Sequence, residues 1–498
     1  MNTMNKLIYI SLAFISLVFS LRATEAQRPN IIWLMSEDMG IDLECYGMPG
    51  VKTPHLNQLA AEGALYTRAY ALNPICSPSR SSMMVGVHPT VINAQHHRSN
   101  EDVPLVSPYK PITHYLRKAG YTCLIGHEKV YSMGLKTDCN FKHERVGAYD
   151  GVKEFGLFDR EGAFTAEDQP FFSQIQLKVT HRGDWWNDIR KKSEHPVQLE
   201  DVELPPYYVD TPEIRYDWAA YLDTVEYMDN EVGILMQDLK DKGLAGNTIV
   251  IFIADNGRCN IRGKGFLYEA GIHVPMIVWA PGLIEAGTVI DELVTTTDIS
   301  ASILKLAGAS KPEYITANPI IGVDNPVYRD YVYASRDIWG EIDECSRSIT
   351  TKRFKYIKNH MPEVPWSVDH AYSELNRPAL HVMRVLKAKG ELSEFEMTYF
   401  QDTKPVEELY DLDNDPFEMN NLAQNPEYAK VLEELRGHQL EWQAANFDHG
   451  LADIGKREPV VGSTVTVRAN VKRDEPDLWK RLESGELMQT QQWMKEFK

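Results

Sequence analysis

The sequence predicts an α/β fold in which a mostly parallel β-sheet carries helices on both faces, followed by a smaller α+β domain with an antiparallel sheet. From residue 28 onward, short apolar runs alternate with helical segments, the pattern of strands joined by crossover helices. After about residue 330 the runs alternate apolar and polar residues, as antiparallel strands do. The chain has 498 residues, and single cores stop growing at about 250–300 residues. We therefore expect a large domain over residues 27–330 and a smaller one over residues 331–498.

Residues 1–26 have the pattern of a signal peptide. Lys6 supplies a positive start, residues 7–21 form an apolar run, and the small residues before position 27 suit cleavage after Ala26. A transmembrane anchor is the alternative interpretation, but this run falls short of the roughly 20 residues that a spanning helix needs. We expect an exported protein, periplasmic or secreted after cleavage, with no stable membrane span.

The charge balance restricts the partners. The chain has 52 Lys and Arg against 71 Asp and Glu, a net charge of −19. Bulk attraction to nucleic acid or to an anionic membrane is therefore not expected. An anionic substrate would need a local basic pocket.

Several segments of the large domain can be assigned in order. Residues 30–35 (NIIWLM) and 247–254 (NTIVIFIA) are apolar enough for strands that are buried on both faces. Residues 55–66 predict a helix that leads to a strand near 67–72, and residues 112–126 predict a helix, a turn at Gly120 and a strand. Residues 217–243 predict a long amphipathic helix that Gly243 ends.

The second domain is predicted from three strand-like segments, at residues 330–335 (DYVYAS), 346–351 (SRSITT) and 354–359 (FKYIKN). A helical tail is expected after residues 408–428 (ELYDLDNDPFEMNNLAQNPEY).

Two acidic pairs follow buried strands directly. Glu37 and Asp38 come after the first strand, and Asp255 and Asn256 come after the strand that ends at residue 254. The carboxyl ends of such strands can meet at one end of a sheet, where open α/β folds bind ligands. Carboxylate and amide oxygens suit calcium or magnesium better than zinc. The sequence therefore predicts a site for Ca²⁺, with Mg²⁺ as the alternative.

The six cysteines are irregularly spaced, at positions 45, 76, 123, 139, 259 and 345. In an oxidising compartment some of them could pair, and Cys123 with Cys139 is the first pair to test. Cys76 lies in NPICSPSRSSMMVGV without a second cysteine within three residues, so neither a CxxC redox pair nor a zinc knuckle begins there. Metal thiolate chemistry does not explain it.

The segment CSPSR (76–80) resembles the C-x-P-x-R core of the formylglycine-dependent sulfatases, which have an alkaline-phosphatase-like fold. The acidic first strand, ADNG, GKGFLYEAGIHVPMIVWAPG and ELYDLDNDPFEMNNLA also resemble that family in the same order, and KTDCNF (136–141) resembles a variant seen in bacterial polysaccharide sulfatases. The resemblance implies that a separate maturation enzyme oxidises Cys76 to formylglycine, an aldehyde. One oxygen of its hydrate attacks sulfur, and the other later expels sulfate by regenerating the aldehyde.

The resemblance also implies roles for individual residues. Arg80 holds the hydrate beside the metal, and the modified Cys76 completes a metal shell that includes the two acidic pairs. Lys264, in RGKGFLYE, contacts sulfate. His181, in KVTHRGDWW, lies near the leaving oxygen and is the expected general acid.

The sequence departs from the family pattern in two places. Many sulfatases have a glycine-lysine-x-histidine run where this chain reads GHEKVYSMGLKTDCNF, with His127 at the lysine position and Lys129 at the histidine position. Lys136, in KTDCNF, is the rival of Lys129, and we favour Lys136 with His127 as its partner. Glu37 stands where aspartate is usual, and it either reaches the metal or turns away.

Substrate contacts are expected from two further segments. NAQHHRS supplies His96, His97 and Arg98, and SRDIWGEIDE supplies Arg336, Asp337 and Asp343. Trp185, Trp186 and Trp339 are candidates for stacking on sugar faces, although tryptophan is more often packed in a core.

The sequence as a whole predicts an exported sulfatase that acts on sugars of a sulfated polysaccharide or its oligosaccharides. One alternative is a phosphomonoester or phosphonate-ester hydrolase of the same superfamily. The other is a catalytically inactive, carbohydrate-binding relative.

Overall fold

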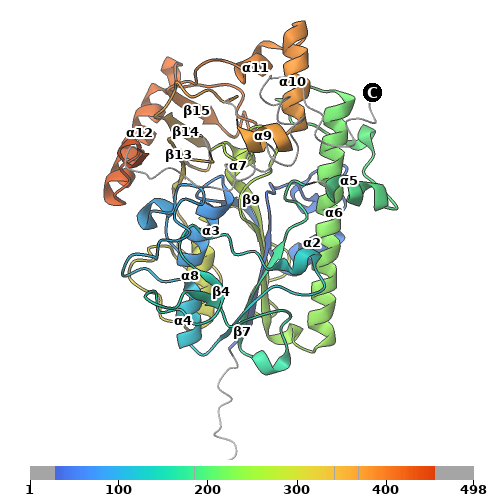
Figure 1. The fold of residues 1–498 in the computed structure, drawn as a ribbon, viewed down its shortest axis with the longest axis vertical. Helices are drawn as coiled ribbons and strands as arrows, with labels where there is room; N and C mark the ends of the chain where they lie inside the picture. Colours follow the sequence, from blue (N-terminus) through green and yellow to red (C-terminus); the bar gives the residue numbers. More distant parts are fainter. Residues whose placement is uncertain (1–27, 184, 341, 368–369, 455–498) are drawn as a thin grey trace, which may run out of the picture.

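The computed structural model describes residues 28–183, 185–340, 342–367 and 370–454. The predicted signal peptide lies outside these residues. Two sheets organise the described chain, a large one and a smaller one that lies toward one end of the molecule (Figure 1). No helix in the described ranges is long and apolar enough to cross a membrane.

The large sheet has nine strands in the order β10-β2-β9-β8-β1-β7-β3-β6, with β11 paired to β2. It is mixed but mostly parallel, as predicted, because only the β2–β9 and β8–β9 pairs are antiparallel. Its strands are β1 (Asn30–Ser36), β2 (Ala64–Tyr70), β3 (Thr122–Ile125), β6 (Arg160–Glu161), β7 (Phe171–Leu177), β8 (Thr248–Ala254), β9 (His273–Trp279), β10 (Thr288–Ile290) and β11 (Val294–Thr295).

The three central strands position the chemistry. Every residue of β1, β7 and β8 is buried, because helices cover both faces of the sheet. In the register of the parallel pairs, Ser36 lies opposite Ala254 on one side and Leu177 on the other. The residues that follow these three positions therefore leave the sheet side by side.

The helices form two layers. In Figure 1, α3, α4 and α8 lie on one side of the sheet, and α2, α5 and α6 lie on the other. The long helix α6 begins with Pro212, and the side chain of Thr211 accepts a hydrogen bond from Ile214 N, which caps its first turn. The helices up to residue 306 are α2 (Pro54–Glu62), α3 (Cys76–Val85), α4 (Ile112–Lys118), α5 (Trp185–Lys192), α6 (Pro212–Asp241), α7 (Glu269–Ile272) and α8 (Thr296–Leu306).

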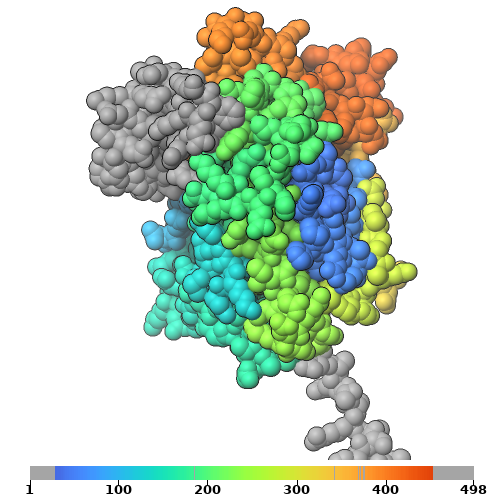
Figure 2. Space-filling view, turned by 90° about the vertical axis from the view of Figure 1, so that its right-hand side faces the viewer, coloured from blue at the N-terminus to red at the C-terminus, as the bar shows by residue number. Residues whose placement is uncertain are grey.

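The smaller sheet is antiparallel, in the order β12-β13-β14-β15. It comprises β12 (Val332–Arg336), β13 (Ser346–Thr350), β14 (Phe354–Asn359) and β15 (Glu407–Asp411), and its helices are α9 (Ala371–Asn376), α10 (Pro378–Lys389), α11 (Glu394–Thr398), α12 (Ala429–Ala445) and α13 (Leu451–Ile454). Leu432 and Leu435 of α12 pack on Ile349, Tyr356 and Leu409 of this sheet. The orange and red residues of this part gather at one end of the molecule in Figure 2.

Two sequence expectations need correction. The second strand begins at Ala64, three residues before the predicted segment, since α2 already ends at Glu62 and Gly63 separates the two elements. The cysteines at 123 and 139 are unpaired: the Cys123 thiol donates to Thr113 O and the Cys139 thiol to Thr137 O, each at 3.8 Å.

Two further short strands, β4 (Glu144–Val146) and β5 (Gly156–Phe158), pair with each other.

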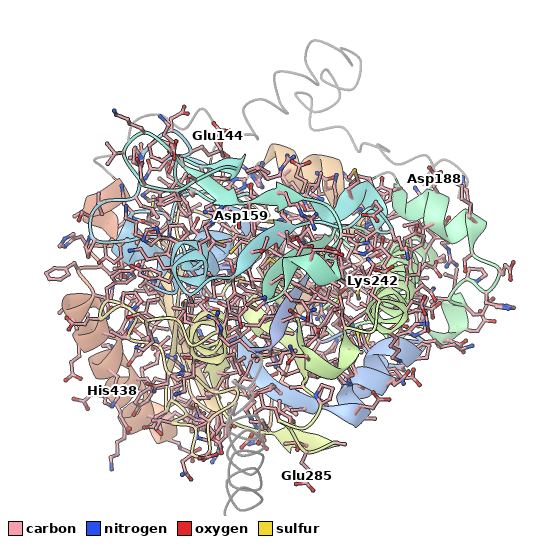
Figure 3. The ribbon with its side chains drawn as sticks, turned by 90° about the horizontal axis from the view of Figure 1, so that it is seen from below. Glu144, Asp159, Asp188, Lys242, Glu285 and His438 are labelled. Atoms are coloured by element: carbon pink, nitrogen blue, oxygen red, sulfur yellow. The ribbon has the colours of Figure 1, made fainter. Side chains whose placement is uncertain are left out.

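The charged side chains of Glu144, Asp188 and Glu285 lie around the periphery of the molecule (Figure 3), as expected for residues that remain hydrated.

Candidate active site

Cys76 is the first residue of α3, a helix in which every residue is buried. Pro78 fits in the first turn, where the backbone N–H that proline lacks would have no helical acceptor. The hydroxyl of Ser79 donates to Asp255 O at 2.5 Å, and this bond fixes the helix to the end of β8. The Cys76 thiol is therefore held at the N-terminus of a helix that abuts the carboxyl end of the sheet.

Glu37, Asp38, Asp255 and Asn256 meet at that end, as predicted from the two strands, and all four are 0% exposed. The backbone N–H of Asp38 donates to Asp255 Oδ1 at 3.0 Å, and the Asn256 amide donates to Asp38 Oδ1 at 3.0 Å. Asp38 has a φ of 48°, in the left-handed region, which aspartate tolerates better than most residues. This turn aims its carboxylate at Cys76.

Lys264 joins the acidic pair to the thiol. Its Nζ lies 2.7 and 2.8 Å from the two oxygens of Asp38 and 2.9 Å from Cys76 Sγ. Burial alone would lower the pKa of Lys264, but the Asp38 carboxylate raises it well above its usual value, so the ammonium stays charged. Burial raises the pKa of Cys76, which remains a thiol.

Arg80 and Lys136 bring two more cationic groups. Arg80 Nε donates to Asp255 Oδ2 at 2.9 Å, one helical turn after Cys76. Lys136 Nζ lies 2.6 Å from Glu37 Oε2. Burial would raise the pKa of Glu37, but Lys136, His181 and Arg80 together hold it below its usual value. Three cations therefore surround Cys76 in an otherwise acidic protein, which is the local basic pocket that an anionic substrate needs.

His181 follows β7 and faces the same cluster. Its Nε2 lies 3.7 Å from Asp38 Oδ2, and its Nδ1 lies 3.0 Å from Arg182 O. Burial lowers the pKa of His181 to about 4, so the ring is neutral near pH 7. The indoles of Trp185 and Trp186 donate to Val179 O and His181 O, which ties them into this loop and away from a role as open sugar platforms.

The acidic residues fit a hard divalent cation. Glu37 Oε1 and Asn256 Oδ1 are buried without a hydrogen-bond partner, and buried polar oxygens are rarely left unpaired. Asp38, Cys76 and His181 also offer ligand atoms within 4.8 Å of one another. The unpaired oxygens belong to the carboxylate and amide set, however, and oxygen ligands favour calcium or magnesium. Glu37, Asp38, Asp255 and Asn256 are thus the residues that would hold the ion.

The structure does not bring His127 and Lys129 to this cluster. His127 Nε2 lies 3.1 Å from Asp238 Oδ2 of α6, and Lys129 Nζ lies 2.5 Å from Asp238 Oδ1. The GHEK segment turns away from Cys76 after β3, and the chain returns to the site only at Lys136. We correct the prediction accordingly and assign the lysine position to Lys136 alone, without His127 as its partner.

The SRDIWGEIDE segment needs a similar correction. Asp337 is 1% exposed and pairs with Arg347 at 3.1 Å, and Arg336 pairs with Glu344 at 3.4 Å. These buried ion pairs occupy both side chains that were expected to contact sugar. Asp343 of the same segment is half-buried.

Of the NAQHHRS residues, Arg98 is bonded both to α3 and to Asp138. It makes two hydrogen bonds to Asp138, at 2.7 and 3.0 Å, and its backbone N–H donates to Ser77 Oγ of α3. His96 and His97 are buried, and His97 N donates to Ile338 O at 2.9 Å. Burial holds the pKa of His97 well below its usual value.

Sequence reasoning missed two residues of the site. Asp138 bridges Arg98 to Lys136, whose Nζ lies 3.3 Å from Asp138 Oδ2. Tyr372 of α9 places its ring 5.2 Å from Lys264 Nζ and 5.1 Å from the Trp339 ring. The position of Asp138, two residues after Lys136, was a usable signal, but nothing in the sequence near Tyr372 indicated that it folds over Lys264, more than a hundred positions earlier.

Comparisons with known proteins agree with this geometry. The family described as Sulfatase matches residues 29–309, and the one described as N-sulphoglucosamine sulphohydrolase, C-terminal, matches residues 257–376. An ulvan-active sulfatase of Formosa agariphila is 33% identical over 471 residues, covering 85% of this chain and 76% of that protein. N-sulphoglucosamine sulphohydrolase of Homo sapiens is 26% identical over 474 residues, covering 87% and 93% respectively.

A solved 2-O GAG sulfatase shares the fold, with a TM-score of 0.61 at 17% identity over 85% of this chain and 93% of that one. Three observations agree on the family. They are the paired strands that end in acidic residues, the CSPSR helix, and the family match over more than half of the sequence. This chain belongs to the sulfatase family and is a sulfuric ester hydrolase with an alkaline-phosphatase-like fold.

Proposed function

We propose that the protein is an exported sulfatase that hydrolyses O-sulfate esters on sugars of a sulfated polysaccharide or its oligosaccharides, using formylglycine made from Cys76 and a bound divalent cation. The observation that carries this proposal is the position of Cys76, 2.9 Å from Lys264 Nζ and 3.5 Å from Asp38 Oδ1. The names of the relatives, which act on ulvan or on sulfated glucosamine, support a sugar as the carrier of the sulfate.

The charges around Cys76 suit a sulfate ester. Lys264, Lys136 and Arg80 present cationic N–H groups, and charge-assisted hydrogen bonds to anionic oxygens are about twice as strong as neutral ones. The N-terminus of α3 adds its free backbone N–H groups and the positive end of the helix dipole. Asp38, Glu37 and Asp255 already hold these three cations beside Cys76, which limits the reorganisation needed to stabilise charge on the ester oxygens.

Oxidation of Cys76 by a maturation enzyme would replace the thiol with an aldehyde, whose hydrate supplies one oxygen to attack sulfur and a second to release sulfate. A cation held by Glu37, Asp38, Asp255 and Asn256 would supply positive charge at the ester oxygens. Within this arrangement Arg80 keeps Asp255 in place, and Lys136 keeps Glu37 in place.

His181 is the proposed proton donor to the leaving sugar oxygen. Its ring is neutral in the free protein, because burial lowers its pKa. An anionic ester beside the ring favours the protonated form, so we expect substrate binding to raise this pKa. Substitution of His181 should then lower the rate most for esters with poor leaving groups, since these depend most on protonation.

The proposal is tested by mass spectrometry and by activity. After expression with a sulfatase-maturing enzyme, the peptide that contains Cys76 should carry an aldehyde that reacts with a hydrazide. The protein should hydrolyse p-nitrophenyl sulfate in preference to the corresponding phosphate and phosphonate esters, and Cys76→Ala should be inactive. A preference for phosphorus esters would identify the alternative hydrolase, and an unmodified thiol in an inactive protein would identify the binding relative.

A further inference from the structure

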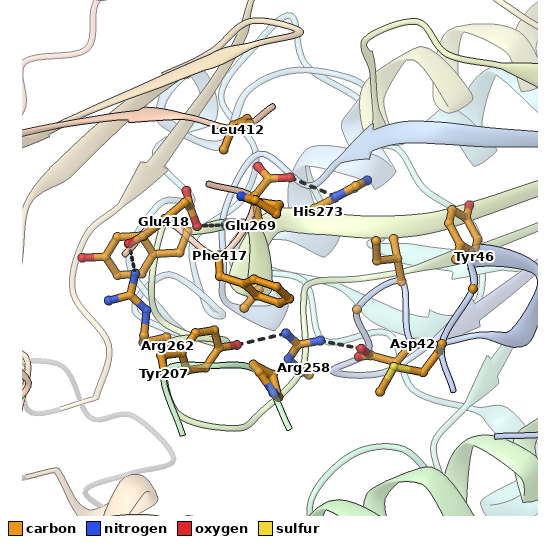
Figure 4. A pocket seen from close by; sticks show the side chains of 18 of the residues that line it. Asp42, Tyr46, Tyr207, Arg258, Arg262, Glu269, His273, Leu412, Phe417 and Glu418 are labelled. Atoms are coloured by element: carbon orange, nitrogen blue, oxygen red, sulfur yellow. Dashed lines mark hydrogen bonds and ion pairs between the residues drawn. The ribbon is translucent and has the colours of Figure 1, made fainter. Parts of the chain in front are cut away.

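A second cavity lies at the edge of the large sheet, outside the Cys76 cluster (Figure 4). It has a volume of about 510 Å³, within the roughly 300–1,000 Å³ typical of small-molecule sites. Of the described residues that line it, none is Cys76, Arg80, Lys136, His181 or Lys264. Its walls come from β2, from the loops that follow β1, β8 and β10, from residues 203–207 and the first turns of α6, from α7 and the start of β9, and from residues 412–418 after β15.

Five carboxylates and three arginines line this cavity, and several of them form ion pairs: the lining carboxylates are Asp42, Glu203, Glu269, Asp291 and Glu418, and the arginines are Arg68, Arg258 and Arg262. The pairs, with their shortest nitrogen to oxygen distances, are Arg258 with Asp42 at 2.5 Å, Arg68 with Asp291 at 2.8 Å, and Glu269 with Lys355 at 2.6 Å and with His273 at 2.9 Å. Figure 4 shows Arg258 between Asp42 and Tyr207, whose hydroxyl accepts a second bond at 3.0 Å. Since carboxylates outnumber arginines, the cavity offers hydrogen-bonding groups without the surplus of cations that a sulfated unit would require.

Aromatic rings make up much of the remaining wall. Phe417 is 41% exposed, and its ring lies 6.3 Å from that of Tyr207. Tyr46 directs its hydroxyl into the sheet, toward Tyr66 O and Met276 O, so its polar end is already bound there. Phe417 lies between Glu269 and Arg258 in Figure 4, with paired charges on both sides of an apolar face.

We propose that this cavity binds an uncharged saccharide segment, as a second sugar site of the enzyme. A sugar presents C–H faces that pack on aromatic rings and hydroxyl groups that bond to paired carboxylates and guanidinium groups. The inference rests on the proposed function in one respect, namely that the substrate is a polymer of sugars. An unsulfated stretch of that polymer then binds here while a sulfated unit occupies the Cys76 cluster.

The loops that build the cavity continue from the active site. Gly40 and Asp42 follow Asp38 by two and four residues, and Arg258 follows Asn256 by two. A saccharide held here is thus anchored to the same loops that carry the acidic residues. The expected benefit is a lower KM for long substrates with no change for small esters, because a second contact on one chain raises its effective concentration at the first site.

The test measures binding of short xylo-, manno- and galacto-oligosaccharides to the full-length protein by saturation-transfer NMR and calorimetry. We expect at least one of these probes to bind, and its Kd to rise about tenfold in Phe417→Ala, the effect of losing one stacking ring worth about 1.4 kcal/mol. Phe417→Tyr keeps the ring and should bind normally. Phe447→Ala, at a phenylalanine that is 77% exposed and does not line the cavity, is the matched control.

Two results would overturn this inference: none of the probes binds to the wild-type protein, or binding is unchanged in Phe417→Ala. Hydrolysis of p-nitrophenyl sulfate, measured in the same variants, separates the inference from the proposed function. Full activity without saccharide binding rejects only the cavity, whereas saccharide binding that depends on Phe417 in a protein without sulfatase activity supports the cavity and rejects the function.

Discussion

Glu231 of α6 is a buried carboxyl group that lowers stability at neutral pH. It is 3% exposed, its Oε1 accepts Tyr131 N at 2.5 Å, and its Oε2 has no hydrogen-bond partner. Burial raises its pKa from 4.5 to about 7. Because one pKa unit corresponds to about 1.4 kcal/mol, ionised Glu231 costs the folded protein on the order of 3 kcal/mol.

The sign follows from proton binding. Between pH 4.5 and 7 the folded state keeps the Glu231 proton while the unfolded state has lost it, so stability falls as the pH rises through this window. Glu231→Gln stays neutral and keeps an oxygen for Tyr131 N. We expect its free energy of unfolding to exceed that of the wild type by about 1–3 kcal/mol at pH 8, with the difference shrinking toward pH 4.5.

Urea denaturation at a series of pH values, followed by circular dichroism, measures this difference. Glu285→Gln is the control, because this glutamate is exposed and should leave the pH dependence unchanged. If wild type and Glu231→Gln differ by the same amount at every pH, the carboxyl group does not ionise in the folded protein as described. Sulfatase activity should survive in Glu231→Gln but fall in Glu231→Ala, since only glutamine retains the acceptor for the turn that leads to Lys136.

The remaining predictions concern the site. Asp138→Asn should lower kcat/KM for p-nitrophenyl sulfate about tenfold, because Lys136 and Arg98 lose their shared anion. Asparagine tolerates the φ of 51° at this position, so we expect the variant to fold normally. An unchanged thermal stability would exclude misfolding as the cause of the lower activity. Tyr372→Phe keeps the ring near Lys264 and should change KM less than twofold. Tyr372→Ala should raise KM by about tenfold, because it loses a cation–π contact worth roughly 0.5–2 kcal/mol. Equal effects of the two variants on KM would refute this role for the ring. Chelation should lower both activity and Tm, since the acidic residues then repel one another, and Ca²⁺ should restore both; an unchanged Tm would argue against an ion at these oxygens.

The predictable part of the site is the part that the backbone encodes locally. An acidic pair directly after a buried strand is fixed by the sheet register, so Asp38 and Asp255 could be placed together from two short segments. Cys76 and Arg80 share one helix and needed no tertiary information beyond it.

Residues on long connections could not be placed in this way. Nothing in the segment GHEKVYSMGLK decides which lysine returns to the cluster, because that depends on Asp238 of α6, more than a hundred residues later, which binds Lys129. The sequence predicts Arg336 and Asp337 as sugar contacts, but the fold of the second sheet brings their partners Glu344 and Arg347 to them. Charge alone does not distinguish a buried ion pair from a binding group.

The complete burial of α3 bears on when Cys76 can be modified. Once α3 has docked against α8 and the end of β8, Cys76 is only 2% exposed, and the sulfur lies beneath Lys264 and Asp38. An enzyme that oxidises this thiol needs the surrounding CSPSR residues as an extended, accessible peptide. If Cys76 is matured as proposed, modification has to precede folding, and a chain that folds first keeps its thiol. Under the same proposal the fraction of active molecules depends on the rate of maturation relative to the rate of folding, and slower folding or more maturation enzyme should raise it.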